Sequence, residues 1–181
     1  MYNDPHHQIF TTPLWGWKLD DEKHHVSDYI DYINELSTLE KSEKKSNFGG
    51  WQSRDNLNED GIFREFISKI TQLANDCVPK AAITGMWANI NNYKDCNGQH
   101  RHGGTLAGVF YCSVPKNSGR LVLVDPRNIG VHDAPNNPRN FPVNPEPLSL
   151  IIFPSWLDHY VEPNMSNEPR ISLSFNIDQE H

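Results

Sequence analysis

Two segments in the N-terminal half repeat their apolar residues every three or four positions, which is the spacing of one face of an α-helix. The segments cover 26–36 and 62–74, and their apolar residues are Val26, Tyr29, Ile30, Ile33 and Leu36, then Ile62, Phe63, Phe66, Ile67, Ile70, Leu73 and Ala74. We expect Asp20 or Asp21 to cap the first helix and Pro79 to stop the second. Amphipathic stripes usually face a core, so these helices are expected to supply packing rather than chemistry.

After residue 84 the apolar period changes from about 3.6 to 2, which predicts β-strands. The strand segments are short, rich in β-branched or aromatic residues, and bounded by Gly, Pro or Asn: 84–93, 105–114, 120–125, 148–153 and 171–177, with an earlier strand over 9–19. Strands in succession without intervening helices predict an antiparallel sandwich or barrel. We therefore expect a mainly β (α+β) protein, a single domain over 1–181, whose helical support (20–80) covers one outer face of a β core (84–177).

The segment 126–147 fits neither pattern, since it has prolines at 126, 135, 138, 142, 145 and 147 and little periodicity. Loops longer than about 12–15 residues are usually functional or disordered. The segment is therefore either a tolerated surface insertion or a lid or rim over a pocket.

Charge and cysteine content narrow the class of protein. The formal net charge of −7 lacks the basic footprint of a protein that binds nucleic-acid duplexes, and no apolar run is long enough to span a membrane. Cys77, Cys96 and Cys112 are odd in number and far apart, which argues against a disulfide framework or a cysteine zinc site. We expect a cytoplasmic protein that acts on a small molecule or a peptide.

Three of the nine histidines are candidates for a metal site. His100 and His102 form a His-x-His pair between two expected strands, where side chains two residues apart point the same way. His159 follows the apolar strand 148–153 and is positioned to supply a third ligand. Three protein ligands with open positions suit a non-heme Fe(II) oxygenase, whereas structural zinc usually takes a fourth ligand.

The last strand alternates an apolar face with a polar one. Ile171, Leu173, Phe175 and Ile177 form the first face, and Arg170, Ser172, Ser174 and Asn176 form the second. The polar face is either a solvent-facing edge or the lining of a barrel interior. A guanidinium inside a barrel needs an anionic partner, and a carboxylate bound through two hydrogen bonds is the natural one. Ser172 is placed to add another hydrogen bond.

These motifs together resemble the Fe(II)/2-oxoglutarate-dependent oxygenases, and most closely a family found in bacteria and their viruses. The order His-x-His, His and Arg-x-Ser matches the superfamily. The more specific strings are Phe10-Thr11-Thr12-Pro13, Phe48-Gly49-Gly50-Trp51-Gln52-Ser53, Met86-Trp87-Ala88-Asn89, Gly108-Val109-Phe110-Tyr111, Val124-Asp125-Pro126-Arg127, Phe153-Pro154-Ser155-Trp156-Leu157-Asp158-His159 and Arg170-Ile171-Ser172-Leu173-Ser174-Phe175-Asn176. The resemblance covers nearly the whole chain and implies a double-stranded β-helix, or jelly-roll barrel.

The resemblance also implies roles for individual residues. It makes three histidines the Fe(II) ligands, and it makes Arg170, supported by Ser172, the clamp for the distal carboxylate of 2-oxoglutarate. Further cosubstrate contacts would come from Tyr111 and Asn89, and Asn91 is a further candidate because it shares the face of Asn89. The ligands are His100, His102 and His159. Most of the superfamily has Asp at the position of His102, so this chain departs from the pattern there.

The implied activity is hydroxylation of a substrate C–H bond with Fe(II), 2-oxoglutarate and O₂, releasing succinate and CO₂. Trp87 and Trp156 are candidate pocket walls, although aromatic side chains more often serve as core packing. Two alternatives stay open from the residues alone. One is a cupin-like metal enzyme that does not use 2-oxoglutarate, and the other is a non-catalytic jelly roll that binds a carboxylate or a metal.

Overall fold

The computed structural model describes residues 11–127 and 139–180. Two α-helices, three short 3₁₀ helices and two antiparallel sheets make up this part of the chain. In chain order they are β1 (Trp15–Lys18), η1 (Asp20–His24), α1 (Val26–Leu39), β2 (Asn47–Phe48), β3 (Trp51–Gln52), η2 (Leu57–Glu59), η3 (Gly61–Phe63), α2 (Arg64–Asn75), β4 (Ala81–Asn91), β5 (Cys96–His100), β6 (Leu106–Ser113), β7 (Leu121–Val124), β8 (Asn140–Val143), β9 (Ser149–Pro154), β10 (His159–Val161) and β11 (Arg170–Gln179).

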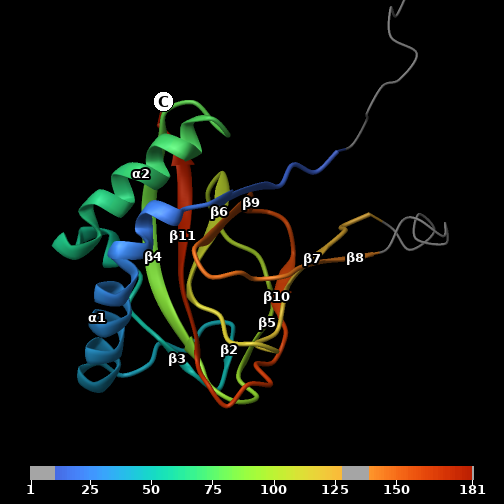
Figure 1. Cartoon of the computed structure of the whole chain (residues 1–181). Helices are drawn as coiled ribbons and strands as arrows, with labels where there is room; N and C mark the ends of the chain where they lie inside the picture. The colour runs from blue at the N-terminus through green and yellow to red at the C-terminus, as the bar shows by residue number, and fades with distance from the viewer. Residues whose placement is uncertain (1–10, 128–138, 181) are drawn as a thin grey trace, which may run out of the picture.

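The two sheets face each other and enclose a barrel interior (Figure 1). The larger sheet has the strand order β1-β9-β6-β11-β4-β3, and the smaller has the order β2-β5-β10-β7-β8. Consecutive strands therefore alternate between sheets for much of the chain, as in a jelly roll. The expected antiparallel, mainly β fold is confirmed.

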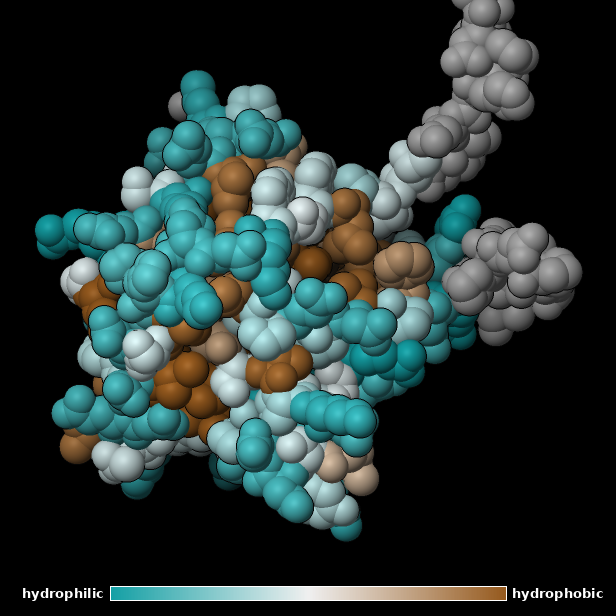
Figure 2. Space-filling view, viewed as in Figure 1, coloured by the Kyte–Doolittle hydropathy of each residue, from teal (hydrophilic) through white to brown (hydrophobic). Residues whose placement is uncertain are grey.

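Helices α1 and α2 lie on the outer face of the larger sheet, away from the smaller one (Figure 1). Phe66 of α2 packs on Phe110 of β6 with ring centroids 4.9 Å apart. Hydrophilic residues cover much of this side of the molecule, with apolar patches between them (Figure 2). None of the helices described here is both long and apolar enough to cross a membrane.

The alternation along β11 decides where the polar interior lies. Leu173, Phe175 and Ile177 are fully buried in the layer between the sheet and the helices. Arg170 and Ser172 point to the opposite side and line the barrel interior. Of the two alternatives for the polar face of this strand, the structure therefore selects the interior.

A short connection of two strands, β2 and β3, links the edges of the two sheets. Its strands β2 and β3 pair with β5 and β4, one in each sheet. Gly49 and Gly50 join them with φ of +72° and +65°, a conformation that side chains with a Cβ rarely adopt. A Cβ at Gly49 would also lie 2.0 Å from Asp95 Oδ1, so the turn is fitted closely against that carboxylate.

Several expected boundaries are wrong. The α1 N-cap is His25 without a side-chain cap bond, because Asp20 opens a separate 3₁₀ helix instead of capping α1. Helix α2 ends at Asn75, before Pro79 is reached. The segment 126–147 is not one loop, since β8 lies within it and pairs with β7. Residues 9–10 of the earliest expected strand, and residues 128–138 of the possible lid, lie outside the described residues.

Candidate metal and carboxylate site

Three histidine side chains meet inside the barrel. His100 ends β5 and His159 begins β10, and the antiparallel pairing of these strands places the two residues opposite each other. His102 lies two residues beyond His100, and its Nε2 is 3.1 Å from Nε2 of His159. One nitrogen from each ring lies within 4.8 Å of the others. The structure therefore brings together all three histidines that the sequence singled out.

Backbone carbonyls orient two of these rings. Nδ1 of His100 lies 2.7 Å from the carbonyl oxygen of Gly98, and Nδ1 of His159 lies 2.9 Å from that of Leu157. A carbonyl only accepts, so each Nδ1 carries a proton and each Nε2 presents a lone pair. A hydrogen bond of this type to the second ring nitrogen is a usual feature of metal-binding histidines.

Burial keeps the imidazoles neutral. Desolvation, together with the neighbouring His159 and His100, lowers the pKa of His102 to about 3. Desolvation and then His100 lower the pKa of His159 to about 4. Burial also lowers the pKa of His100. Neutral imidazoles are the form that binds a metal, so at neutral pH all three are ready to act as ligands.

The donor set fits an open metal site. In the described part of the chain, the cluster holds three histidines and no cysteine, aspartate or glutamate. Three nitrogen donors satisfy half of an octahedral ion and leave positions for other ligands. The set therefore suits a catalytic ion better than a structural zinc.

Arg170 lies in the same cavity and lacks an anionic partner. Its side chain is 2% exposed. Its guanidinium donates to the carbonyls of Ser118 and Gly119 and, over 3.0 Å, to Asn91 Oδ1, all of which are neutral. Within 11–127 and 139–180, no carboxylate pairs with it. Desolvation by burial lowers the pKa of Arg170, because the charged guanidinium loses its hydration inside the barrel.

Strand register surrounds Arg170 with polar groups. Arg170 pairs with Asn91, and Ser172 lies between Asn89 on β4 and Tyr111 on β6. All five line the cavity that the histidines also line. Asn89 Oδ1 is buried and accepts no hydrogen bond from any described residue. The structure thus gathers every sequence-predicted site residue around one cavity.

Burial raises the pKa of Tyr111 to about 12, although Arg170 acts in the opposite direction. The phenol is therefore protonated at neutral pH and can donate a hydrogen bond. Its hydroxyl makes none within the described residues. It is available to a ligand.

Sequence reasoning missed two residues of this network. Asn91 donates to Asn97 Oδ1 over 3.4 Å, and Asn97 donates to Ser46 Oγ over 3.3 Å. Arg170, Asn91, Asn97 and Ser46 therefore form a chain of hydrogen bonds across the barrel. Asn97 lies on β5, whose five residues show no apolar alternation, so no sequence pattern indicated an inward-facing side chain there.

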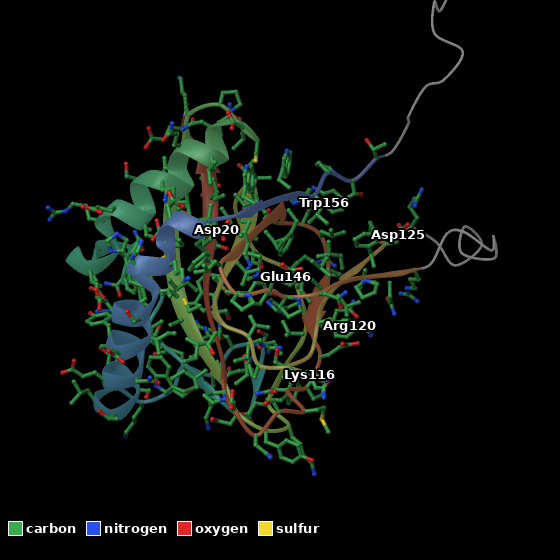
Figure 3. All side chains as sticks on the ribbon, in the orientation of Figure 1. Asp20, Lys116, Arg120, Asp125, Glu146 and Trp156 are labelled. Carbon is green, nitrogen blue, oxygen red and sulfur yellow. The ribbon has the colours of Figure 1, made fainter. Side chains whose placement is uncertain are left out.

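The two tryptophans have different positions. Trp87 lines the cavity, and its ring lies 5.4 Å from that of His102. Trp156 is 49% exposed, and Figure 3 shows it at the surface beyond the sheets. It does not line the cavity formed by the described residues, and it is too exposed to be core packing, so neither of the two roles considered for it is found.

Comparison with protein families gives one match. The family described as "Putative 2OG-Fe(II) oxygenase" matches residues 85–176, a segment that runs from β4 through β11 and includes all three histidines and Arg170. A search of curated proteins finds no match.

Solved structures share the fold at low sequence identity. The epimerase SnoN from nogalamycin biosynthesis, an α-ketoglutarate-dependent non-heme enzyme, superposes with a TM-score of 0.75 at 13% identity, covering 93% of this chain and 77% of its own. A Pseudomonas putida prolyl-4-hydroxylase gives 0.71 at 12% identity, covering 94% and 95%. The viral collagen prolyl hydroxylase of Paramecium bursaria chlorella virus-1, a 2-oxoglutarate complex, gives 0.65 at 12% identity, covering 92% and 96%. The expected jelly-roll barrel is confirmed.

Proposed function

The chain belongs to the 2OG-Fe(II) oxygenase family, and on this premise we propose that His100, His102 and His159 bind Fe(II) and that Arg170 binds the distal carboxylate of 2-oxoglutarate. The protein is a non-heme iron oxygenase that uses 2-oxoglutarate and O₂. We propose that its reaction hydroxylates a C–H bond of a small molecule or a peptide.

One observation carries the proposal. A single cavity is lined by three imidazoles with their Nε2 atoms turned together and by a buried guanidinium that has only neutral partners. A dicarboxylic acid with a 2-oxo group is complementary to both features, because one end can chelate an ion while the other neutralises an arginine. A cupin-like enzyme without 2-oxoglutarate, or a jelly roll that binds only a metal, does not require Arg170 to be buried there. A jelly roll that binds only a carboxylate does not require the three histidines.

The polar residues around Arg170 have distinct tasks. Asn91 accepts from one guanidinium nitrogen and thereby fixes the direction of the others. Ser172 and Tyr111 offer hydroxyl groups beside it. Because Tyr111 stays protonated, it donates to the carboxylate instead of repelling it. Asn89 supplies an amide whose oxygen has no partner among the described residues.

When bound together, Fe(II), 2-oxoglutarate and O₂ supply the oxidative decarboxylation that yields succinate, CO₂ and the oxygen atom inserted into the substrate. The contribution of the protein is position and exclusion of water. The carbonyls of Gly98 and Leu157 hold two ligand rings in place. Val109, Leu121 and Phe153 add apolar wall to the same cavity.

The cavity wall contains no acidic residue among the described positions. With His102 where most of the superfamily has Asp, the protein contributes neutral imidazoles and one positive guanidinium. The charges of Fe(II) and Arg170 together exceed those of a 2-oxoglutarate dianion by one. We therefore propose that this site binds the dianion more strongly than a His-x-Asp site would, because no protein carboxylate competes for the ion.

The direct test measures succinate released from 2-oxoglutarate by protein reconstituted with Fe(II) and ascorbate, together with the bound metal. His159→Ala should abolish both metal retention and succinate release. The control is His24→Ala, which removes an exposed imidazole from η1 and should behave as the unchanged protein. Equal succinate from His159→Ala and the unchanged protein would remove this histidine from the site.

Two broader proposals accompany the site. We propose that residues 1–181 act as one oxygenase domain, since the helices and the barrel share a core. We propose the cytoplasm as its compartment, which suits the free thiols of Cys77, Cys96 and Cys112. Fractionation of cells that express the tagged chain tests the second proposal.

A further inference from the structure

Two hollows approach the histidine cluster from different sides. The inner cavity contains Arg170 and Tyr111, and an outer groove runs along the seam between β4 and the β2–β5 edge. The lining of the outer groove includes Lys45, Phe48, Gln52, Asp55, Arg101 and Asn176. Ser46, Trp87, His100 and His102 line both. A molecule in the groove and a molecule in the cavity would therefore meet at the same ion.

The buried part of the outer groove carries two carboxamides without partners. Gln52 is 5% exposed, yet its side-chain amide makes no hydrogen bond within the described residues. Asn176 Oδ1 is fully buried and likewise has no partner there. A buried polar atom without a partner costs free energy, so Asn176 Oδ1 indicates a ligand that donates a hydrogen bond to it. The amide of Gln52 is free to pair with the same ligand.

The charged side chains that the described residues contribute to the groove are either paired or exposed. Arg101 lies beside them but pairs with Asp158 over 3.0 Å. Lys45 and Asp55 are exposed and of opposite sign. A charged substrate group placed against Gln52 and Asn176 would lose its hydration without gaining a counter-charge. The part of the substrate that lies against Gln52 and Asn176 is therefore expected to be uncharged.

An aromatic side chain stands at the rim. Phe48 is 67% exposed, and its ring lies directly over Gly98, where an added Cβ would be 2.5 Å from Phe48 Cε2. The turn at Gly49 and Gly50, between β2 and β3, helps to fix the position of this ring. The groove thus combines one exposed ring with two planar groups that each offer a donor and an acceptor.

We propose that the outer groove binds the substrate and that the substrate is an uncharged stretch of peptide, held through its main-chain amides by Gln52 and Asn176. A peptide group is planar and carries one donor and one acceptor, so it matches a carboxamide in both respects. Phe48 then covers an apolar side chain of the peptide. The inference rests on the proposed function, since it assumes that the histidines hold the ion.

The test measures binding to protein loaded with Mn(II) and the inert analogue N-oxalylglycine. A library of octapeptides without charged residues is incubated with this complex, retained peptides are identified by mass spectrometry, and the Kd of the best one is measured by fluorescence anisotropy. Asn176→Ala and Gln52→Ala should each raise the Kd of that peptide about three- to tenfold, which is the effect of losing one neutral hydrogen bond. Asn140→Ala removes an exposed carboxamide from β8 and should leave the Kd unchanged.

A second measurement separates this inference from the site itself. The Kd of 2-oxoglutarate for Asn176→Ala should lie within about twofold of the Kd for the unchanged protein, because Asn176 does not line the inner cavity. If Asn176→Ala does not fold, Asn176→Asp can be used instead, because it retains the shape of the side chain. Its negative charge should raise the Kd of the peptide. Retention of no peptide, or stimulation of succinate release only by free amino acids or sugars, would overturn the peptide assignment while 2-oxoglutarate binding persists. Loss of 2-oxoglutarate binding by the unchanged protein would instead overturn the proposed function.

Discussion

Replacement of Arg170 by Met is expected to separate ligand binding from stability. The substitution keeps an unbranched side chain of similar reach but removes the charge and the donors to Asn91, Ser118 and Gly119. Two effects on stability oppose each other. Buried acceptors left without a donor cost about 1–3 kcal/mol each, whereas relief from burying an unpaired charge returns several kcal/mol. We expect the free energy of unfolding to change by less than about 2 kcal/mol.

The effect on 2-oxoglutarate should be much larger. Removal of one partner from a buried, hydrogen-bonded charge pair costs about 2–5 kcal/mol, which corresponds to a Kd raised about 30-fold to several thousand-fold. Calorimetric titration of 2-oxoglutarate into Mn(II)-loaded protein gives the Kd, and urea denaturation of the metal-free protein gives the stability. Metal loading should be unchanged, because Arg170 is not among the clustered ligands.

Arg120→Met is the matched control. The side chain of Arg120 is 46% exposed and pairs with Glu162 over 2.6 Å at the surface, where Figure 3 labels it. Exposed ion pairs contribute about 0–1 kcal/mol, so both the Kd and the stability should change little. A Kd that rises less than threefold in Arg170→Met would place the distal carboxylate elsewhere. A loss of stability above about 4 kcal/mol would show that the main role of Arg170 is to stabilise the fold.

Three further outcomes follow from individual contacts. Asn91→Asp should raise the stability of the metal-free protein, as urea denaturation would show, because the new carboxylate would lie 3.0 Å from Arg170. It should also raise the Kd of 2-oxoglutarate about tenfold or more in calorimetry, because that carboxylate would compete with the ligand for Arg170. Gly108→Ala should lower the stability in urea by about 1–3 kcal/mol, since its Cβ would lie 2.3 Å from the buried ring of Phe175, and an unchanged midpoint would refute that overlap. Burial and Asp76 raise the pKa of Cys77 to about 11, so iodoacetamide at pH 8 should alkylate this thiol far more slowly than an unperturbed one, as mass spectrometry of the digest would show.

The long strands were predictable because each has one apolar face that packs against another layer of the fold. In β11 the apolar positions from Ile171 to Ile177 recur every second residue, and the helix layer buries them all. The polar positions between them were ambiguous, since a solvent edge and a polar barrel interior look alike in sequence. Only the position of the smaller sheet, which covers Arg170 and Ser172, resolves the ambiguity.

The histidine pair was found through its spacing, although its strand was not expected. Residues of β5 are Cys-Asn-Gly-Gln-His, without the alternation that marks a half-buried strand. The segment forms a strand because it pairs with β10, and this pairing places His159 opposite His100. Asn97 was missed for the same reason. Its inward direction depends on this pairing and not on any neighbour in sequence.

Short strands were missed where tertiary contacts outweigh local preference. The segments β2 and β3 have two residues each, and β8 contains Pro142, which disfavours a central strand. β8 is tolerated because it is an edge strand that pairs only with β7. The turn between β2 and β3 depends on Gly49 and Gly50, and the reason is the close approach of Asp95, which lies far from them in sequence.

The distribution of the core explains how a polar site fits inside so small a barrel. Of the residues that the structure describes, 23 buried apolar ones lie in the layer between the larger sheet and the helices, whereas 7 lie in the barrel interior. Most hydrophobic stabilisation therefore comes from outside the barrel, so the interior can hold buried histidines, carboxamides and an unpaired arginine. Substitutions in the helix layer, as at Phe66, should reduce stability before activity. A substitution of the interior residue Asn89 should reduce activity before stability, because it removes an amide oxygen that has no partner among the described residues rather than an apolar contact.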